Sequence, residues 1–211
     1  IYENFKLFDR NALLYPAKDF IFFQADIHSN LLEQQRIEVW KALAAGTPVT
    51  VILTMTAFLN HLMPFSVWKE QIVSLRNDDT LDLDLWKRKL VELGYERNAQ
   101  VEGPGQFAVR GGILDVFPLT EENPVRIELW GDEIDSIRSF DLESQRSIEN
   151  LDAVTIYPAS ELILTPEILE KGLEKIEKEA GKAEQVFRKA MKTEEAYRVK
   201  TLAADCRDRL L

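Results

Sequence analysis

The sequence has few of the residues on which metal, thiol and disulfide chemistry depends. A single cysteine, Cys206, cannot form a disulfide within the chain, and the only histidines are His28 and His61. One cysteine and two distant histidines make neither a convincing zinc site nor a Cys–His nucleophile pair. The apolar runs are far shorter than the roughly 20 residues needed to span a bilayer. These absences predict a cytoplasmic chain without a metal site or a membrane partner.

Features that bind phosphate are also missing. The loop GxxxxGKS/T, whose backbone amides hold nucleotide phosphates, occurs nowhere in the 211 residues. Acidic residues exceed basic ones by 36 to 26, so a broad nucleic-acid surface would form against a net charge of −10. The glycines beside Pro104 and at Gly111 and Gly112 do not lie between a strand and a helix, which favours hairpin turns. We therefore predict no ATP hydrolysis and no cofactor.

Residues 1–73 alternate between strand and helix patterns. The predicted elements are strands at 12–15 and 49–53, a helix from a Ser29 cap to Gly46, and a short helix at 57–62. Such alternation is typical of a parallel α/β layer. Because the chain starts at Ile1 in the middle of this pattern, we expect it to be a piece of a longer protein that continues the layer.

Residues 74–158 have a different character. An apolar stripe from Leu83 to Leu93 predicts a helix that Gly94 closes at its C′ position. Short apolar runs separated by Gly, Pro, Asn and Asp then predict strands at 95–100, 106–110, 112–117, 125–130, 133–140 and 154–157. This pattern indicates an antiparallel meander with the helix packed on one face.

The remaining residues, 159–211, are predicted to be helical. Thr165 is an N-cap followed by Pro166, and the apolar stripe of this helix is interrupted at Gly181. Two further helices are expected, around Val186 and around Val199. The predicted fold class is therefore α/β (α+β), with a parallel layer, an antiparallel sheet domain and a helical segment.

One strand carries a pattern of interface residues. In the segment 125–130 the odd positions are apolar, which places Arg126, Glu128 and Trp130 together on the opposite face. Arg110, at the end of a nearby strand, can reach the same face. Arginine and tryptophan are the residue types that most often anchor protein interfaces, because they combine large contact area with directional donors.

The pattern predicts which side chains on these strands are exposed. If Arg110, Arg126 and Trp130 form one partner-binding face, each should be substantially exposed, with Ile127 and Leu129 buried beneath the sheet. Two other interpretations stay open from the pattern alone: both sides of the sheet are covered, or Trp130 packs over the turn that follows it.

Several long motifs resemble the amino-terminal part of the bacterial transcription-repair coupling factor (Mfd) family. They are GYER at 94–97, EGPGQFAVRGGILDVFP at 102–118, PVRIELWGDEIDSIR at 124–138, FD at 140–141 and SQRSI at 144–148. The resemblance is strongest over residues 74–158. It extends over the preceding α/β segment and is weak over the terminal helices.

The UvrB family of excision-repair proteins is similar over the same meander. UvrB proteins insert a tyrosine-rich DNA-clamping hairpin in their first domain, whereas only 11 residues lie between Pro16 and His28 here. The QFAVRGGI and SQRSI motifs also look like the coupling factors. We therefore prefer the coupling-factor family, and the alternative is a UvrB-type fragment that handles DNA.

The resemblance implies a UvrB-like module of three parts. Residues 1–73 would be a partial domain 1A without a working ATP site, residues 74–158 a domain 2 that binds UvrA, and residues 159–211 the helical start of domain 1B. In the family, the residues that contact UvrA are an Arg of the Arg-Gly hairpin, an Arg on the following strand and an aromatic residue four positions later. These positions are Arg110, Arg126 and Trp130 here, and the family often has Phe at the last one.

The resemblance also implies a role without catalysis for this segment. The module would recruit UvrA, and with it nucleotide excision repair, to stalled RNA polymerase. A downstream domain of the same protein could cover the same face until UvrA competes for it. The DNA translocase driven by ATP and the domain that binds RNA polymerase would also lie downstream.

Overall fold

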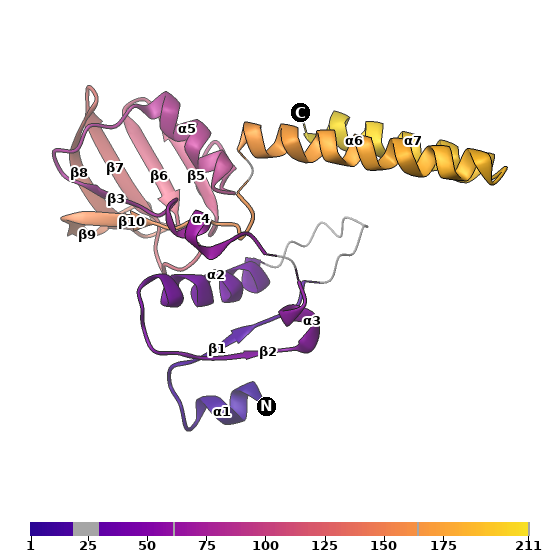
Figure 1. Ribbon diagram of the computed structural model, residues 1–211. Coiled ribbons are helices and arrows are strands. Elements are labelled where there is room, and N and C mark those ends of the chain that lie inside the picture. Colours follow the sequence, from indigo (N-terminus) through magenta and orange to yellow (C-terminus); the bar gives the residue numbers. More distant parts are fainter. Residues whose placement is uncertain (19–29, 61, 164, 211) are drawn as a thin grey trace. The chain divides into compact units, whose positions relative to one another are not determined.

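The computed structural model describes residues 1–18, 30–60, 62–163 and 165–210. Their contacts divide the chain into two compact units, residues 1–163 and residues 164–211. The first unit contains strands and helices and the second contains two helices (Figure 1). The predicted mixed fold class is confirmed, and the finer division at residues 73 and 158 stays a prediction.

The first unit begins with a small parallel α/β segment. β1 (Ala12–Tyr15) pairs in parallel with β2 (Thr50–Leu53), and α2 (Asn30–Ala44) packs over β1. The segment also contains the short helices α1 (Tyr2–Lys6), α3 (Met55–Phe58) and α4 (Phe65–Lys69). The predicted parallel layer is confirmed. The predicted cap at Ser29 lies outside the described residues.

The largest sheet of the first unit has six strands in the order β4–β5–β6–β7–β8–β9. Its strands are β4 (Glu96–Arg97), β5 (Gln106–Arg110), β6 (Ile113–Phe117), β7 (Val125–Trp130), β8 (Glu133–Phe140) and β9 (Ser147–Leu151). The antiparallel meander is confirmed from β5 to β8. It needs correction at both ends, because β4 is short and parallel to β5, and because β9 was not predicted.

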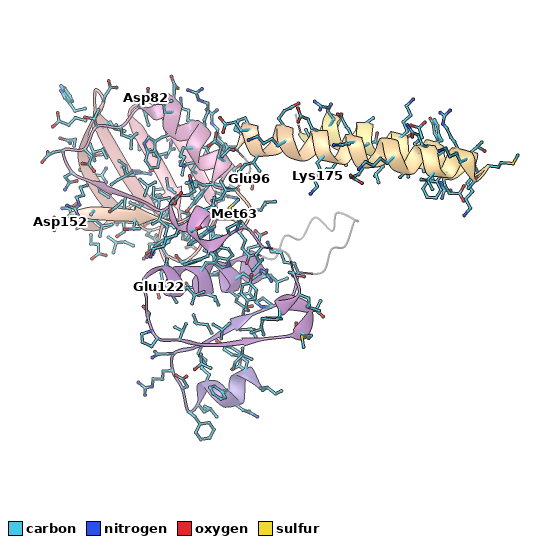
Figure 2. All side chains as sticks on the ribbon, viewed as in Figure 1. Met63, Asp82, Glu96, Glu122, Asp152 and Lys175 are labelled. Carbon is cyan, nitrogen blue, oxygen red and sulfur yellow. The ribbon has the colours of Figure 1, made fainter. Side chains whose placement is uncertain are left out.

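The last predicted strand belongs to a separate pair. β10 (Ala153–Ile156) runs antiparallel to β3 (Val73–Arg76), so these two strands form their own ribbon beside the large sheet. Figure 2 shows Asp152 at the corner between β9 and β10. Val154 and Ile156 of β10 are buried, which accounts for the apolar alternation in the sequence.

Helix α5 (Leu83–Glu92) covers one face of the six-stranded sheet (Figure 1). Asp82 caps its first turn, because the Asp82 carboxylate accepts the backbone N–H of Asp84 at 2.8 Å. At the other end Gly94 has φ +90°, as its predicted C′ position requires. The buried side chains between helix and sheet include Leu90, Leu93, Phe107, Leu114 and Ile127.

A buried polar network joins the α/β segment to the chain that follows β10. Glu161 accepts the Nε–H of Arg36 at 2.7 Å and the indole N–H of Trp40 at 2.9 Å. The Tyr15 hydroxyl also donates to Glu161, and it accepts a bond from Arg36 Nη2 at 2.7 Å. Because Arg36 and Glu161 are both buried, the network satisfies two charges that would otherwise be costly to enclose.

The second unit is a pair of helices, α6 (Pro166–Lys189) and α7 (Thr193–Leu210), that pack against each other. Thr165 caps α6, with its hydroxyl accepting the backbone N–H of Ile168, as predicted. The predicted interruption at Gly181 is wrong, because α6 continues through it and a single further helix follows. A glycine within a helix costs only about 1 kcal/mol, and the strong helix formers around Gly181 outweigh that cost.

Candidate partner-binding face

The sheet presents a charged row on the face opposite α5. On β6, Asp115 interrupts an apolar run, and the register places it between Ala108 of β5 and Arg126 of β7. Ile127, next along β7, points the other way and is fully buried in the core. Alternation therefore sends one set of side chains to the core and places Asp115 and Arg126 together on the outer face.

Asp115 is a buried carboxylate shared by two arginines. Its side chain is 2% exposed. Arg126 donates from Nε to Oδ1 at 2.7 Å and from Nη2 to Oδ2 at 2.9 Å, and Arg110 donates from Nη2 to Oδ2 at 3.1 Å. Both carboxylate oxygens are thus satisfied by guanidinium groups, and the contact with Arg126 has the paired geometry that makes such bonds strong.

Arg126 is enclosed on several sides. Its Nη2 also donates to the side-chain oxygen of Gln145 at 3.0 Å, and its guanidinium carbon lies 4.4 Å from the centre of the Phe140 ring. The hydrogen bond to Asp115 raises the pKa of Arg126 above its ordinary value, against the opposing effect of burial. Arg126 is therefore a fixed charge whose side chain is only 14% exposed.

The turn that supplies Gln145 has its own local order. Asp141 accepts the backbone N–H and the hydroxyl of Ser144 at 2.8 and 2.6 Å, and the Ser144 hydroxyl lowers the pKa of Asp141. Gln145 has φ +60°, and its amide donates to the Leu142 carbonyl at 2.8 Å. These bonds orient the Gln145 side-chain oxygen toward Arg126.

A second ion pair continues the charged row toward β8. Arg138 lies directly opposite Arg126 in the ladder, a like-charge pairing that is unfavourable unless each charge has its own partner. Glu128 bonds to Arg138 and also accepts the hydroxyl of Ser136 at 3.2 Å. Each of these two arginines thus has its own acidic partner on the face, Asp115 for Arg126 and Glu128 for Arg138.

Trp130 lies at the end of β7, where the hairpin to β8 turns. It pairs with Glu133 across the hairpin, and Gly131 has φ +66° in the turn between them. Trp130 is 84% exposed, so it packs over neither the turn nor the core. The backbone N–H of Leu129 donates to the Gly112 carbonyl at 2.8 Å, so the β5–β6 hairpin that follows Arg110 lies beside this end of β7.

Of the five predicted exposures, three are met, one is met in part and one fails. Arg110 is 48% exposed, Trp130 is open to solvent and Ile127 is buried, whereas Leu129 is only partly buried. Arg126 was predicted to be substantially exposed, and this is wrong. The reason is Asp115. A carboxylate buried in an apolar sheet needs a cation beside it, so Arg126 is buried together with Asp115.

Asp115 is the residue of the face that sequence reasoning missed. A signal for it was present, because Asp115 lies between Leu114 and Val116 inside a run predicted to be a buried strand. A single acid in such a run indicates either a strand end or a buried charge with a partner. The pattern could not name Arg126 as that partner, since the register between the strands was unknown.

An apolar hollow of about 280 Å³ lies in the α/β segment, close to Met63, which Figure 2 labels. The polar atoms of Tyr15 and Trp40 at its wall both bond to Glu161. The rest of the lining is Val39, Leu43, Val51, Leu62, Met63 and Phe65. This lining is suited to apolar groups and offers no arrangement for holding phosphates.

The described residues hold no cluster of three or more His, Cys, Asp or Glu side chains that could bind a metal ion. Both histidines, His28 and His61, lie outside this part of the chain. No helix within the described residues combines the length and the apolar character of a membrane span.

Comparison with known proteins finds a family match over the sheet domain. Residues 73–162 match the family described as the UvrB interaction domain. The sequence is also 43% identical over 169 residues to the transcription-repair-coupling factor of Bacillus subtilis (strain 168), covering 80% of this chain and 14% of that protein. For the factor of Staphylococcus aureus (strain MRSA252) the identity is 40% over 155 residues, covering 74% and 13%.

The match to the UvrB interaction domain includes Arg110, Arg126 and Trp130, which all lie within residues 73–162. The chain resembles one segment of the transcription-repair-coupling factors, as the sequence motifs predicted. It spans only 14% of the length of the Bacillus subtilis relative.

Proposed function

We propose that this chain is a recruitment module without catalytic activity, and that its UvrB interaction domain binds UvrA. The observation that carries the proposal is the placement of Arg110, Arg126 and Trp130 on one side of a sheet whose other side is buried under α5. The two arginines share Asp115, and Trp130 lies at the same end of the sheet as the β5–β6 hairpin.

The proposed mechanism is complementarity of charge and shape. Arg110 offers donors at the surface, and the exposed indole of Trp130 offers a large flat apolar area. A partner surface with carboxylates opposite the guanidinium groups and an apolar hollow for the indole would match both. Arg126 contributes at its exposed edge and holds the face in place.

In this proposal the longer protein is a transcription-repair coupling factor. Such a protein would use ATP to move along DNA and would bind RNA polymerase through other domains, while this module brings in UvrA and excision repair. The same face could also dock on a downstream domain of the intact protein until UvrA displaces it. The absence of a GxxxxGKS/T loop from the sequence supports a segment that does not itself hydrolyse ATP.

Calorimetric titration of the chain with purified UvrA tests the proposal. The wild-type chain should bind saturably, and Trp130→Ala should weaken binding by roughly 2 kcal/mol or more if the indole is a central anchor. Tyr197→Ala is the matched control, because Tyr197 is also an exposed aromatic, 72% accessible, but lies on α7. A wild-type chain that fails to bind UvrA would refute the proposal.

Filter binding with duplex DNA at low salt tests the alternative of a UvrB-type fragment. An acidic chain with a net charge of −10 should retain little duplex even where electrostatic attraction is least screened. Saturable retention that high salt abolishes would instead favour a DNA-handling role.

A further inference from the structure

The two arginines of the face reach one carboxylate from opposite sides. Arg110 comes from β5 and Arg126 from β7, and Asp115 lies on β6 between them. Arg110 uses one nitrogen for this contact, at 3.1 Å, and Arg126 uses two, at 2.7 and 2.9 Å. A substitution at Asp115 would therefore take a hydrogen-bond partner from both arginines at once, and Arg126 would keep only its contacts with Gln145 and Phe140.

Such a contact changes what the arginines offer a partner. A free arginine side chain loses about 2 kcal/mol of rotamer entropy when a partner immobilises it. This entropic cost of binding is smaller when the side chain is already held in place in the unbound protein. Arg110 is 48% exposed, so donors beyond its bond to Asp115 face solvent. Nη1 of Arg126 makes no hydrogen bond with the described residues, which leaves that amino group for a partner at the exposed edge.

We propose that Asp115 is a positioning residue: its buried carboxylate fixes the guanidinium groups of Arg110 and Arg126 so that their remaining N–H donors meet carboxylates of the partner. This inference rests on the proposed function, since the partner is the one proposed there. It also limits the charge of the cluster, because two guanidinium groups and one carboxylate carry a net charge of +1.

Positioning and simple electrostatics predict opposite results for Asp115→Asn. The substitution removes a negative charge from a face that would meet acids, so attraction alone predicts tighter binding. Positioning predicts weaker binding, because both arginines lose their shared anchor. Glu128→Gln is the charge control: it removes a negative charge from the same face, where Glu128 bonds to Ser136 and Arg138 and has no hydrogen bond to Arg110 or Arg126, and it should leave affinity equal or raise it.

The experiment measures UvrA binding by the full 211-residue chain and its Asp115→Asn variant. We expect the variant to bind about tenfold more weakly or worse, the scale on which charged contacts lose affinity when one partner is removed. Ile127→Ala controls for lost stability, because Ile127 is fully buried on the other side of the same sheet. Binding near the wild-type value by a folded Ile127→Ala variant excludes a general effect of destabilisation.

A double-mutant cycle then separates positioning from a structural role. Arg110→Ala should weaken binding in the wild-type chain and have much less effect in the Asp115→Asn background, because Arg110 is no longer held there. If the effects of Arg110→Ala and Asp115→Asn on binding add, the inference is wrong. It is also wrong if the Asp115→Asn variant binds UvrA as tightly as the wild-type chain does. Either result leaves the proposed function standing. A wild-type chain that does not bind would overturn the proposed function and the inference with it.

A measurement on the wild-type chain covers the case in which Asp115→Asn fails to fold. Nuclear magnetic resonance of ¹⁵N-labelled arginine side chains should show slow hydrogen exchange at Arg126 Nε–H and restricted motion at both Arg110 and Arg126 before UvrA is added. Arg146, an exposed arginine on the turn after β8, is the internal reference for free motion. Motion of Arg110 and Arg126 as fast as that of Arg146 would overturn the inference.

Discussion

Arg126 stabilises the fold as well as the proposed interface, because it neutralises a carboxylate that water cannot reach. Arg126→Ala would leave Asp115 buried with only the single bond from Arg110. Breaking a buried ion pair from one side costs about 3–5 kcal/mol, so we expect a loss of that order in urea unfolding.

The control for Arg126→Ala is Arg146→Ala. Arg146 is exposed and should change the free energy of unfolding by under about 0.5 kcal/mol. Equal unfolding midpoints for the two variants would show that Asp115 does not depend on its partner.

Tyr95 makes stability sensitive to alkaline pH. Tyr95 is buried and its hydroxyl donates to the Tyr157 carbonyl at 2.7 Å, and burial raises the pKa of the Tyr95 phenol well above its ordinary value. The folded state therefore holds this proton more tightly than the unfolded state, whose pKa is about 10. The contribution is complete below that pH and is lost as the pH rises further.

We expect the free energy of unfolding to fall above about pH 10, and to fall less steeply in Tyr95→Phe, which has no proton to lose there. Urea titrations at a series of pH values measure both slopes. Burial also raises the pKa of Tyr15, so part of the dependence should persist in the variant. If the free energy of unfolding falls equally steeply with pH in the wild type and the variant, Tyr95 is not a source of the pH dependence.

Part of the face could be predicted from residues alone. Alternation along β7 separates Arg126 from Ile127 correctly, because neighbouring side chains on a strand must point to opposite faces. Alternation does not tell how deeply a side chain is buried. Arg126 is enclosed by groups from β6, from β8 and from the turn after β8. Those neighbours depend on strand register, which the sequence of a single strand does not contain.

At the scale of elements, the end of α5 depends on Gly94. A Cβ on this residue would lie 2.6 Å from the Cβ of Ser160, and φ is +90°. Gly94→Ala should therefore destabilise the first unit through both a clash and backbone strain, by roughly 2 kcal/mol or more. Thermal unfolding followed by circular dichroism measures the loss.

Gly46→Ala separates the two causes. Gly46 has φ +69°, and a Cβ added there would have no atom within 4 Å, so only the backbone strain applies, about 1 kcal/mol. A Gly94→Ala variant that melts no lower than Gly46→Ala would show that the chain at Ser160 moves aside.

The elements that the sequence predicts well are those with a buried face. β5, β7 and β8 have the predicted bounds, because each carries buried apolar side chains, and along β7 buried and more open positions alternate over the first four residues. β9 could not be recognised in this way, since four of its five residues are exposed and its pairing with β8 is made by the backbone. The continuation of α6 through Gly181 is a similar case, where helix propensity over many residues outweighs one unfavourable position.

For the whole molecule, the boundaries of the sheet domain determine whether it folds alone. Val73 is the partner of Ile156 in the β3–β10 ribbon, and Ala159 and Ile163 are buried in the same core. We expect the fragment 73–163 to melt cooperatively and at a higher temperature than the fragment 74–158 predicted from sequence, because the shorter fragment loses these contacts. Calorimetry of the two fragments compares them, and equal melting temperatures would show that residues 159–163 add nothing.

The exposed indole at the tip of the β7–β8 hairpin gives the molecule an optical label. Of the four tryptophans, Trp40 and Trp68 are buried and Trp86 is partly buried, whereas Trp130 is 84% exposed. Trp130 should therefore supply the long-wavelength part of the fluorescence and the fraction that acrylamide quenches most readily. Trp130→Phe should remove that fraction alone. A partner that covers the hairpin would shift the emission to shorter wavelength and protect it from quenching, so occupancy of this face can be observed without attaching a dye.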